Sequence, residues 1–163
     1  YQQAQIQILT GGEVVRITDQ LRFGTTKSLR ELLDENLRIK MVQLESPGGR
    51  FGEGISLYKL IKERGLSTYT AKECSSACAF AFLGGGKRIL GSSGKLGFHL
   101  PGYQDIDAAT RADFDRETLD FLRATKLPPE IIDQMKATPF EKVWYPDRET
   151  LLSSGIVSDF TSQ

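Results

Sequence analysis

Ser76 and His99 are the residues whose chemistry connects most directly with a reaction. A serine hydroxyl attacks a carbonyl efficiently only when a base removes its proton, and the intermediate needs amide donors for its oxyanion. His99 is the only histidine, so any serine–histidine mechanism must use it. Ser76 precedes an apolar run at residues 77–83, where the free amides of a helix, beginning with Ala77, would point at an anion. The structural alternatives are that Ser75 or Ser76 is a helix N-cap and that His99 is a hydrogen-bonded structural residue.

The Ser-Pro-Gly-Gly segment at residues 46–49 follows a predicted strand and has two interpretations. It is either an ordinary turn or a place where glycine lets backbone amides approach a ligand closely. The glycine run at 84–86 lacks the Gly-Lys-Ser/Thr order of a nucleotide-binding loop, so it predicts a turn or close packing.

Cys74 and Cys78 are the only cysteines and lie four residues apart. If the segment is helical, this spacing brings their Cα atoms near disulfide distance. The alternative is two small buried residues in a reduced compartment. A metal site is not expected, because structural zinc needs four ligands and the single histidine lies elsewhere.

The pattern of apolar residues predicts an α/β fold. Strands are expected at residues 5–9, 13–17, 39–44, 66–70, 87–90, 95–100 and 155–157, and helices from about 28, 54, 77, 105, 128 and 148. The helix from 28 is expected to have Ser28 as its cap, and the helix at 105–126 to be exposed. Gly11-Gly12 separates the first two strands as a hairpin or a crossing to a second layer. Strand–helix alternation favours parallel strands with functional groups in the loops that follow them.

The length of 163 residues fits one domain, residues 1–163. Lys plus Arg equal Asp plus Glu at 21 each, which argues against nucleic acid as a partner. No apolar run reaches the roughly 20 residues that span a bilayer, and no signal peptide is evident. Because the sequence begins at Tyr1 rather than at methionine, we leave open a signal peptide or membrane anchor outside this segment.

The order of these motifs closely resembles the proteolytic subunit of the Clp protease, a member of the ClpP/crotonase superfamily. The matching motifs are Ser-Pro-Gly-Gly at 46–49 with Gly52 and Gly54, Ser-Ser-Ala-Cys-Ala-Phe at 75–80, the segment 84–88, and Phe-His-Leu-Pro at 98–101. The chain is also similar to a bacterial group of Clp-like proteins, often predicted to be periplasmic, with a Cys-x-Ser-Ala-Cys motif. The resemblance runs from about Ile6 to Val157. It implies a stack of ββα units, a projecting helix near 105–126 that joins subunits, and a homo-oligomeric ring.

The resemblance also implies roles for individual residues. Ser76 matches the nucleophile, His99 the general base, and the amides of Gly49 and Ala77 the oxyanion hole. Residues Gly48, Gly49, Arg50 and Leu100 match the segments that bind an extended peptide by β-addition. For the triad acid, Glu141 is nearest in register and Asp147 is the second choice, although either can be solvated surface charge. Related membrane-associated peptidases use a Ser–Lys pair, which makes Lys95 a rival base.

The function that the resemblance implies is that of a serine endopeptidase acting on peptides or unfolded protein segments through an acyl-enzyme on Ser76, without a cofactor. The alternative is a non-catalytic peptide-binding module with the same groove. A crotonase-type acyl-CoA enzyme fits less well, because such enzymes need no serine–histidine pair. In this frame a Cys74–Cys78 bridge would clamp the backbone around Ser76 and persist in an oxidising compartment, so we expect a periplasmic or otherwise exported protein.

Overall fold

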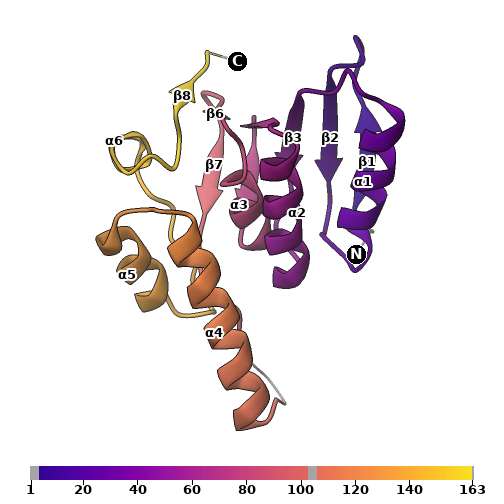
Figure 1. Ribbon diagram of the computed structural model, residues 1–163. Coiled ribbons are helices and arrows are strands. Elements are labelled where there is room, and N and C mark those ends of the chain that lie inside the picture. The colour runs from indigo at the N-terminus through magenta and orange to yellow at the C-terminus, as the bar shows by residue number, and fades with distance from the viewer. Residues whose placement is uncertain (1–3, 103–105, 163) are drawn as a thin grey trace.

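The computed structural model describes residues 4–102 and 106–162. Its strands are β1 (Gln5–Ile8), β2 (Val14–Thr18), β3 (Met41–Glu45), β4 (Ser67–Thr70), β5 (Glu73–Ser75), β6 (Arg88–Leu90), β7 (Lys95–Gly97) and β8 (Asp159–Phe160). Its helices are α1 (Thr25–Glu35), α2 (Phe51–Glu63), α3 (Ala77–Phe82), α4 (Ala108–Ala124), α5 (Pro129–Ala137) and α6 (Arg148–Ser153). The expected α/β alternation is therefore confirmed (Figure 1).

The described strands form two sheets. The larger sheet has the order β1-β2-β3-β4-β6-β8, in which β1 is antiparallel to β2 and the other neighbours are parallel. Of the two connections considered for Gly11-Gly12, the hairpin forms, with both glycines at positive φ (100° and 74°). The smaller sheet pairs β5 with β7 in parallel, and these two strands lead to the two predicted catalytic residues.

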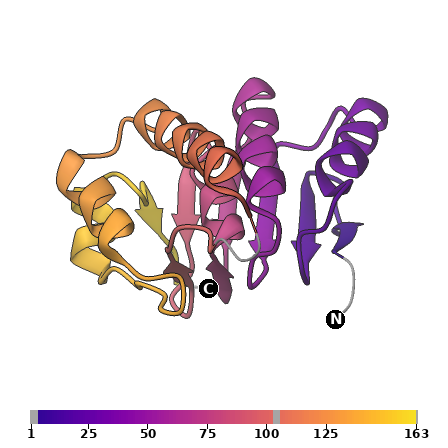
Figure 2. The same cartoon turned by 90° about the horizontal axis from the view of Figure 1, so that it is seen from below.

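Burial follows the residue pattern of each element. Val15 and Ile17 alternate with more exposed residues along β2, and Leu29 and Leu33 form the buried stripe of α1. Helices α1, α2 and α4 lie on the same side of the strands (Figure 2). None of the helices in the described part of the chain combines the length and apolar character needed to cross a membrane.

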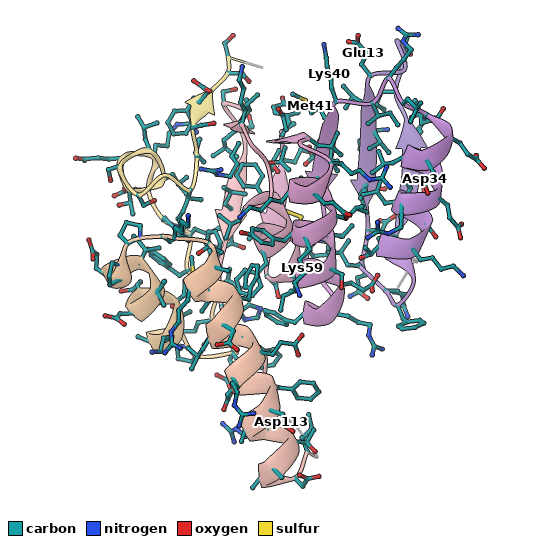
Figure 3. All side chains as sticks on the ribbon, viewed as in Figure 1. Glu13, Asp34, Lys40, Met41, Lys59 and Asp113 are labelled. Atoms are coloured by element: carbon teal, nitrogen blue, oxygen red, sulfur yellow. A yellow bond between two sulfur atoms is a disulfide. The ribbon has the colours of Figure 1, made fainter. Side chains whose placement is uncertain are left out.

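Helix α4 has a packed half and a projecting half. Its C-terminal half is held by Phe121, whose ring lies 4.9 Å from Tyr58 and 5.1 Å from Phe80. Its N-terminal half extends beyond the rest of the molecule in Figure 1, and Asp113, labelled in Figure 3, lies on this part. The projecting helix expected near 105–126 is thus present at 108–124, and residues 103–105 lie outside the described part of the chain.

Three details differ from the sequence-based expectation. Helix α1 begins at Thr25, because the Thr25 hydroxyl donates to the Arg22 carbonyl (2.7 Å) and starts the helix one turn before Ser28. The last strand is at 159–160 rather than 155–157, because pairing with β6 starts when the Ser158 amide donates to the Arg88 carbonyl (2.8 Å). Strand β5 was not expected at all.

Candidate active site

Ser76 lies at the turn between β5 and α3. Its backbone has φ 59° and ψ −125°, and its amide donates to the Gly97 carbonyl of β7 (2.8 Å). Although Ser76 is at the N-cap position of α3, its side chain makes no capping hydrogen bond. The Ser75 hydroxyl instead donates to the Pro47 carbonyl (3.2 Å). The N-cap interpretation therefore fails for both serines, and the Ser76 hydroxyl is left to another partner.

That partner is His99, two residues beyond the end of β7. The distance between His99 Nε2 and Ser76 Oγ is 2.7 Å, and the distance between His99 Nδ1 and the Phe140 carbonyl oxygen is also 2.7 Å. A carbonyl oxygen can only accept, so Nδ1 carries the proton. In the neutral ring Nε2 is then an acceptor, and the Ser76 hydroxyl donates to it. This tautomer is the one that can accept the serine proton.

The expected triad acid does not occupy its place in the structure. The Nδ1 position is taken by the main-chain carbonyl of Phe140, and the neighbouring Glu141 side chain is exposed. Asp147 caps α6 by accepting from the Thr150 amide (2.8 Å), and this bond holds the pKa of the Asp147 carboxyl below its usual value. The direction of the chain at 140–141 explains the difference, because it turns the carbonyl rather than the next side chain toward the imidazole.

Lys95 has no hydrogen bond to Ser76 among the described residues. It is exposed and stands at the start of β7, in register with Glu73, whereas Gly97 is the residue in register with Ser75. The hydrogen-bond position on the Ser76 hydroxyl belongs to His99.

The Ser-Pro-Gly-Gly segment passes directly beside Ser76. The Ser46 hydroxyl accepts from the Gly48 amide (3.1 Å), and a Cβ added to Gly48 would lie 2.7 Å from Ser76 Cβ. Gly48 has φ 114°, so this close approach requires glycine.

The amide of Gly49 faces the side opposite to Leu21. Leu21 donates to the Gly48 carbonyl (2.8 Å) and accepts from the Arg50 amide (2.9 Å), which is the alternation of a parallel bridge. No hydrogen bond within the described residues uses the Gly49 amide or that of Ala77, the first residue of α3. Both predicted oxyanion donors thus have unused N–H groups on segments that flank Ser76.

A cavity of about 420 Å³ opens beside this segment. Its apolar wall includes Phe51 and Ile55 of α2, Ile106 just before α4, and Phe114 of α4. Of the residues expected to bind substrate, Arg50 lines this cavity, whereas Leu100 packs against the core.

The two cysteines form a disulfide that spans Ser76. Cys74 on β5 is bonded to Cys78 on α3, with their Cα atoms 5.2 Å apart and both side chains buried. The expectation of a bridge is confirmed, although the segment is a strand, a turn and a helix rather than one helix. Among the described residues, no group of three or more His, Cys, Asp or Glu side chains is arranged to hold a metal ion.

Phe51 and Phe140 are the site residues that the motifs did not identify. The Phe140 ring stacks on the imidazole at 5.3 Å with an interplanar angle of 10°, and the Phe51 ring lies 5.9 Å from it. Phe51 stands two residues after Gly48-Gly49. An aromatic residue so close to that motif could have indicated from the sequence that its ring lies at the site. Nothing in the sequence marks a main-chain carbonyl at position 140.

Comparison with known proteins identifies solved structures that have a similar fold. Neither the scan against protein-family models nor the search of curated proteins found a match. Among solved structures, the ClpP protease catalytic domain from Plasmodium falciparum is similar with a TM-score of 0.70 and 16% identity over 92% of this chain and 85% of that one. ClpP1 from Listeria monocytogenes is similar with a TM-score of 0.76 and 15% identity over 93% of this chain and 92% of that one. The chain therefore has a ClpP-like fold.

Proposed function

We propose that this chain is a serine endopeptidase that cleaves peptides or unfolded protein segments through an acyl-enzyme on Ser76. The observation that carries the proposal is the 2.7 Å hydrogen bond between Ser76 Oγ and His99 Nε2, in a ring whose Nδ1 is held by another acceptor. The serine–histidine pair of a peptidase needs this order of partners.

The reaction begins when Ser76 Oγ bonds to the carbonyl carbon of the substrate while its proton passes to His99 Nε2. The amides of Gly49 and Ala77 donate to the oxyanion of the tetrahedral intermediate. Collapse of the intermediate breaks the C–N bond, and the imidazolium gives its proton to the leaving amine. A water molecule then attacks the acyl carbon while His99 takes its proton; the ester bond to Ser76 Oγ breaks, His99 returns the proton to that oxygen, and the new carboxylic acid is released.

The substrate lies extended beside residues 48–50 in the manner of an added strand, with its scissile carbonyl at the Gly49 amide, which no hydrogen bond within the described residues uses. The adjoining cavity of about 420 Å³ takes one of its side chains. Its largely aromatic and aliphatic wall favours an apolar side chain over a small polar one.

The disulfide and the projecting helix support two further parts of the proposal. A bridge between two buried cysteines persists in an oxidising compartment, which supports an exported, periplasmic protein. The N-terminal half of α4 extends beyond the rest of the molecule in Figure 1, which supports a homo-oligomer that packs against it.

The proposal is tested by labelling the folded, oxidised protein with a fluorophosphonate probe and locating the adduct by mass spectrometry. We expect one adduct, at Ser76, that is lost in Ser76→Ala and reduced by several orders of magnitude in His99→Ala. Circular dichroism on each variant shows that it is folded. Folded, assembled protein that binds unfolded peptides but never labels would replace the peptidase with the peptide-binding module.

A further inference from the structure

The group that orients His99 is a main-chain carbonyl. The Phe140 carbonyl oxygen accepts from Nδ1 at 2.7 Å, at the place where a carboxylate would complete a triad. In the described part of the chain, no carboxylate oxygen hydrogen-bonds to His99. The two acids considered for the triad are directed elsewhere, Glu141 to solvent and Asp147 to the first turn of α6.

The segment that carries this carbonyl is held on two sides. Phe98 and Trp144 exchange a pair of backbone hydrogen bonds, both of 2.8 Å, directly before His99. The Tyr145 hydroxyl donates to the Glu73 carboxylate of β5 at 2.7 Å. Burial, together with this carboxylate, raises the pKa of Tyr145 to about 12, so the hydroxyl keeps its proton and the bond persists across the neutral range. The carbonyl therefore has a position fixed by the strands that also place Ser76 and His99.

The side chain of Phe140 fixes the imidazole from its face. Its ring stacks on His99, and Phe51 contacts the histidine at a 45° interplanar angle. A Cβ added to Gly102 would lie 2.5 Å from the Phe140 ring, so the absence of a side chain at 102 makes room for the stack. Contacts from two rings restrict rotation of the imidazole away from Ser76.

We propose that Phe140 is the positioning residue of His99, through its carbonyl and its ring, and that no carboxylate shares this role. The inference rests on the proposed function and makes the reacting unit a Ser76–His99 pair supported by a peptide group. A carbonyl selects the Nδ1–H tautomer as a carboxylate does. It lacks a full negative charge, so it stabilises the imidazolium less than a carboxylate would.

The chain suits a direct spectroscopic test. His99 is the only histidine, so ¹⁵N-histidine labelling gives the signals of one ring. Phe-Glu occurs once, at 140–141, so ¹³C-carbonyl phenylalanine with ¹⁵N-glutamate gives one signal for the Phe140 carbonyl. We expect the neutral ring to be the Nδ1–H tautomer and the Phe140 carbonyl shift to follow the His99 titration with the same midpoint. A neutral Nε2–H tautomer, or a carbonyl signal that ignores this titration, would overturn the inference.

Variants that replace a carboxylate by an amide test whether an acid, rather than the Phe140 carbonyl, positions His99. Glu141→Gln and Asp147→Asn remove the carboxylate and preserve the size of the side chain, and the asparagine at 147 can still cap α6. Asp105→Asn tests an acid that lies outside the described residues. We expect each to label with the fluorophosphonate within about threefold of the wild-type rate. An essential carboxylate would cost roughly 10⁴-fold when made an amide, so a folded variant with a loss above about a hundredfold overturns the inference.

Replacing the 140–141 amide by an ester tests the carbonyl itself. An ester carbonyl is a weaker acceptor in the same position, and weakening one hydrogen bond should slow labelling by roughly three- to tenfold. An unchanged labelling rate in the folded ester variant would count against a role for this carbonyl. Failure of the two proposals is distinguishable: wild-type protein that never labels, yet shows the coupled titration, loses the peptidase and keeps the positioning role.

Discussion

Ser76 has a backbone conformation that residues with side chains seldom adopt. Its φ of 59° directs the hydroxyl toward His99 instead of toward the amides of α3, and such a conformation costs about 1–3 kcal/mol. The fold therefore maintains a strained turn at the residue that would perform the chemistry. A strained serine with no capping role is more readily explained by reaction than by stability.

The strain can be measured by comparing Ser76→Gly with Ser76→Ala. Both remove the hydroxyl, but only glycine adopts positive φ without a Cβ penalty. We expect Ser76→Gly to have a free energy of unfolding about 1 kcal/mol higher than Ser76→Ala, measured by urea denaturation of the oxidised proteins. Equal stability, or a more stable alanine variant, would show that the turn is not strained.

Gly48 is the residue whose substitution should most directly displace Ser76. Its added Cβ would lie 2.7 Å from Ser76 Cβ and 2.9 Å from the Ser75 carbonyl oxygen, at a φ that disfavours alanine. Because small misplacements of reacting groups are costly, we expect Gly48→Ala to slow fluorophosphonate labelling by roughly ten- to a hundredfold.

The control for this prediction is Gly86→Ala, measured in the same labelling assay. The atom nearest to its added Cβ is the Leu66 carbonyl oxygen at 3.9 Å, so it should label at nearly the wild-type rate. Equal rates for the two variants would mean that the glycine segment does not constrain Ser76.

The residues that could be predicted from the sequence are those that the proposed mechanism uses through their own side chains. Ser76 and His99, 23 positions apart, are joined by a hydrogen bond as expected. The partner of Nδ1 could not be predicted, because a backbone carbonyl is present at every position and leaves no mark in the sequence. Register led instead to Glu141, which is the next residue after the carbonyl that forms the bond.

At the scale of elements, the disulfide joins β5 to α3 on either side of Ser76. In the loop-entropy description, closing so short a loop contributes about 2 kcal/mol. We expect Cys74→Ala/Cys78→Ala to lower the free energy of unfolding by at least this amount, measured by urea denaturation.

Reduction of the wild-type bridge by a dithiol keeps both sulfur atoms and isolates the effect of the link on the site. We expect the reduced, folded protein to label more slowly, because β5 and α3 are no longer tied on either side of Ser76. If the reduced and oxidised proteins label at one rate while both remain folded, the bridge contributes to stability alone.

Helices and strands with a clear periodic pattern of apolar residues were predicted within a few residues of their observed bounds. Elements that depend on contacts with distant parts of the chain were not predicted. Helix α2, expected from residue 54, is observed at Phe51–Glu63, and the strand expected at 13–17 is observed at Val14–Thr18. Strand β5 has three residues, Glu-Cys-Ser, and no apolar period. It exists because β7 and Ser46 pair with it, and such long-range pairing is not encoded in local sequence.

At the scale of the whole molecule, the N-terminal half of α4 is the part whose position is least explained by packing within a single chain. Thr118, Phe121 and Leu122 are the buried residues of α4, all in its C-terminal half. The N-terminal half projects from the body (Figure 1), and Phe114 on it remains 43% exposed. Ion pairs within the helix, such as Arg116 with Asp113 at 3.4 Å, are exposed and add little stability. A projecting helix of this kind gains stability when another surface covers it.

We therefore expect the protein to sediment as a homo-oligomer heavier than the 18.1 kDa chain and to dissociate on dilution. Hydrogen exchange measured above and below the dissociation concentration should show slower exchange at residues 108–118 in the assembled state, because an oligomer would bury the exposed face of α4. Helix α1, on the opposite side of α2 and far from α4 in Figure 2, should exchange alike in both states. A chain that sediments as a monomer at every concentration, or an α4 with one exchange rate throughout, would remove the homo-oligomer from the proposed function and leave the serine–histidine site to act in a single chain.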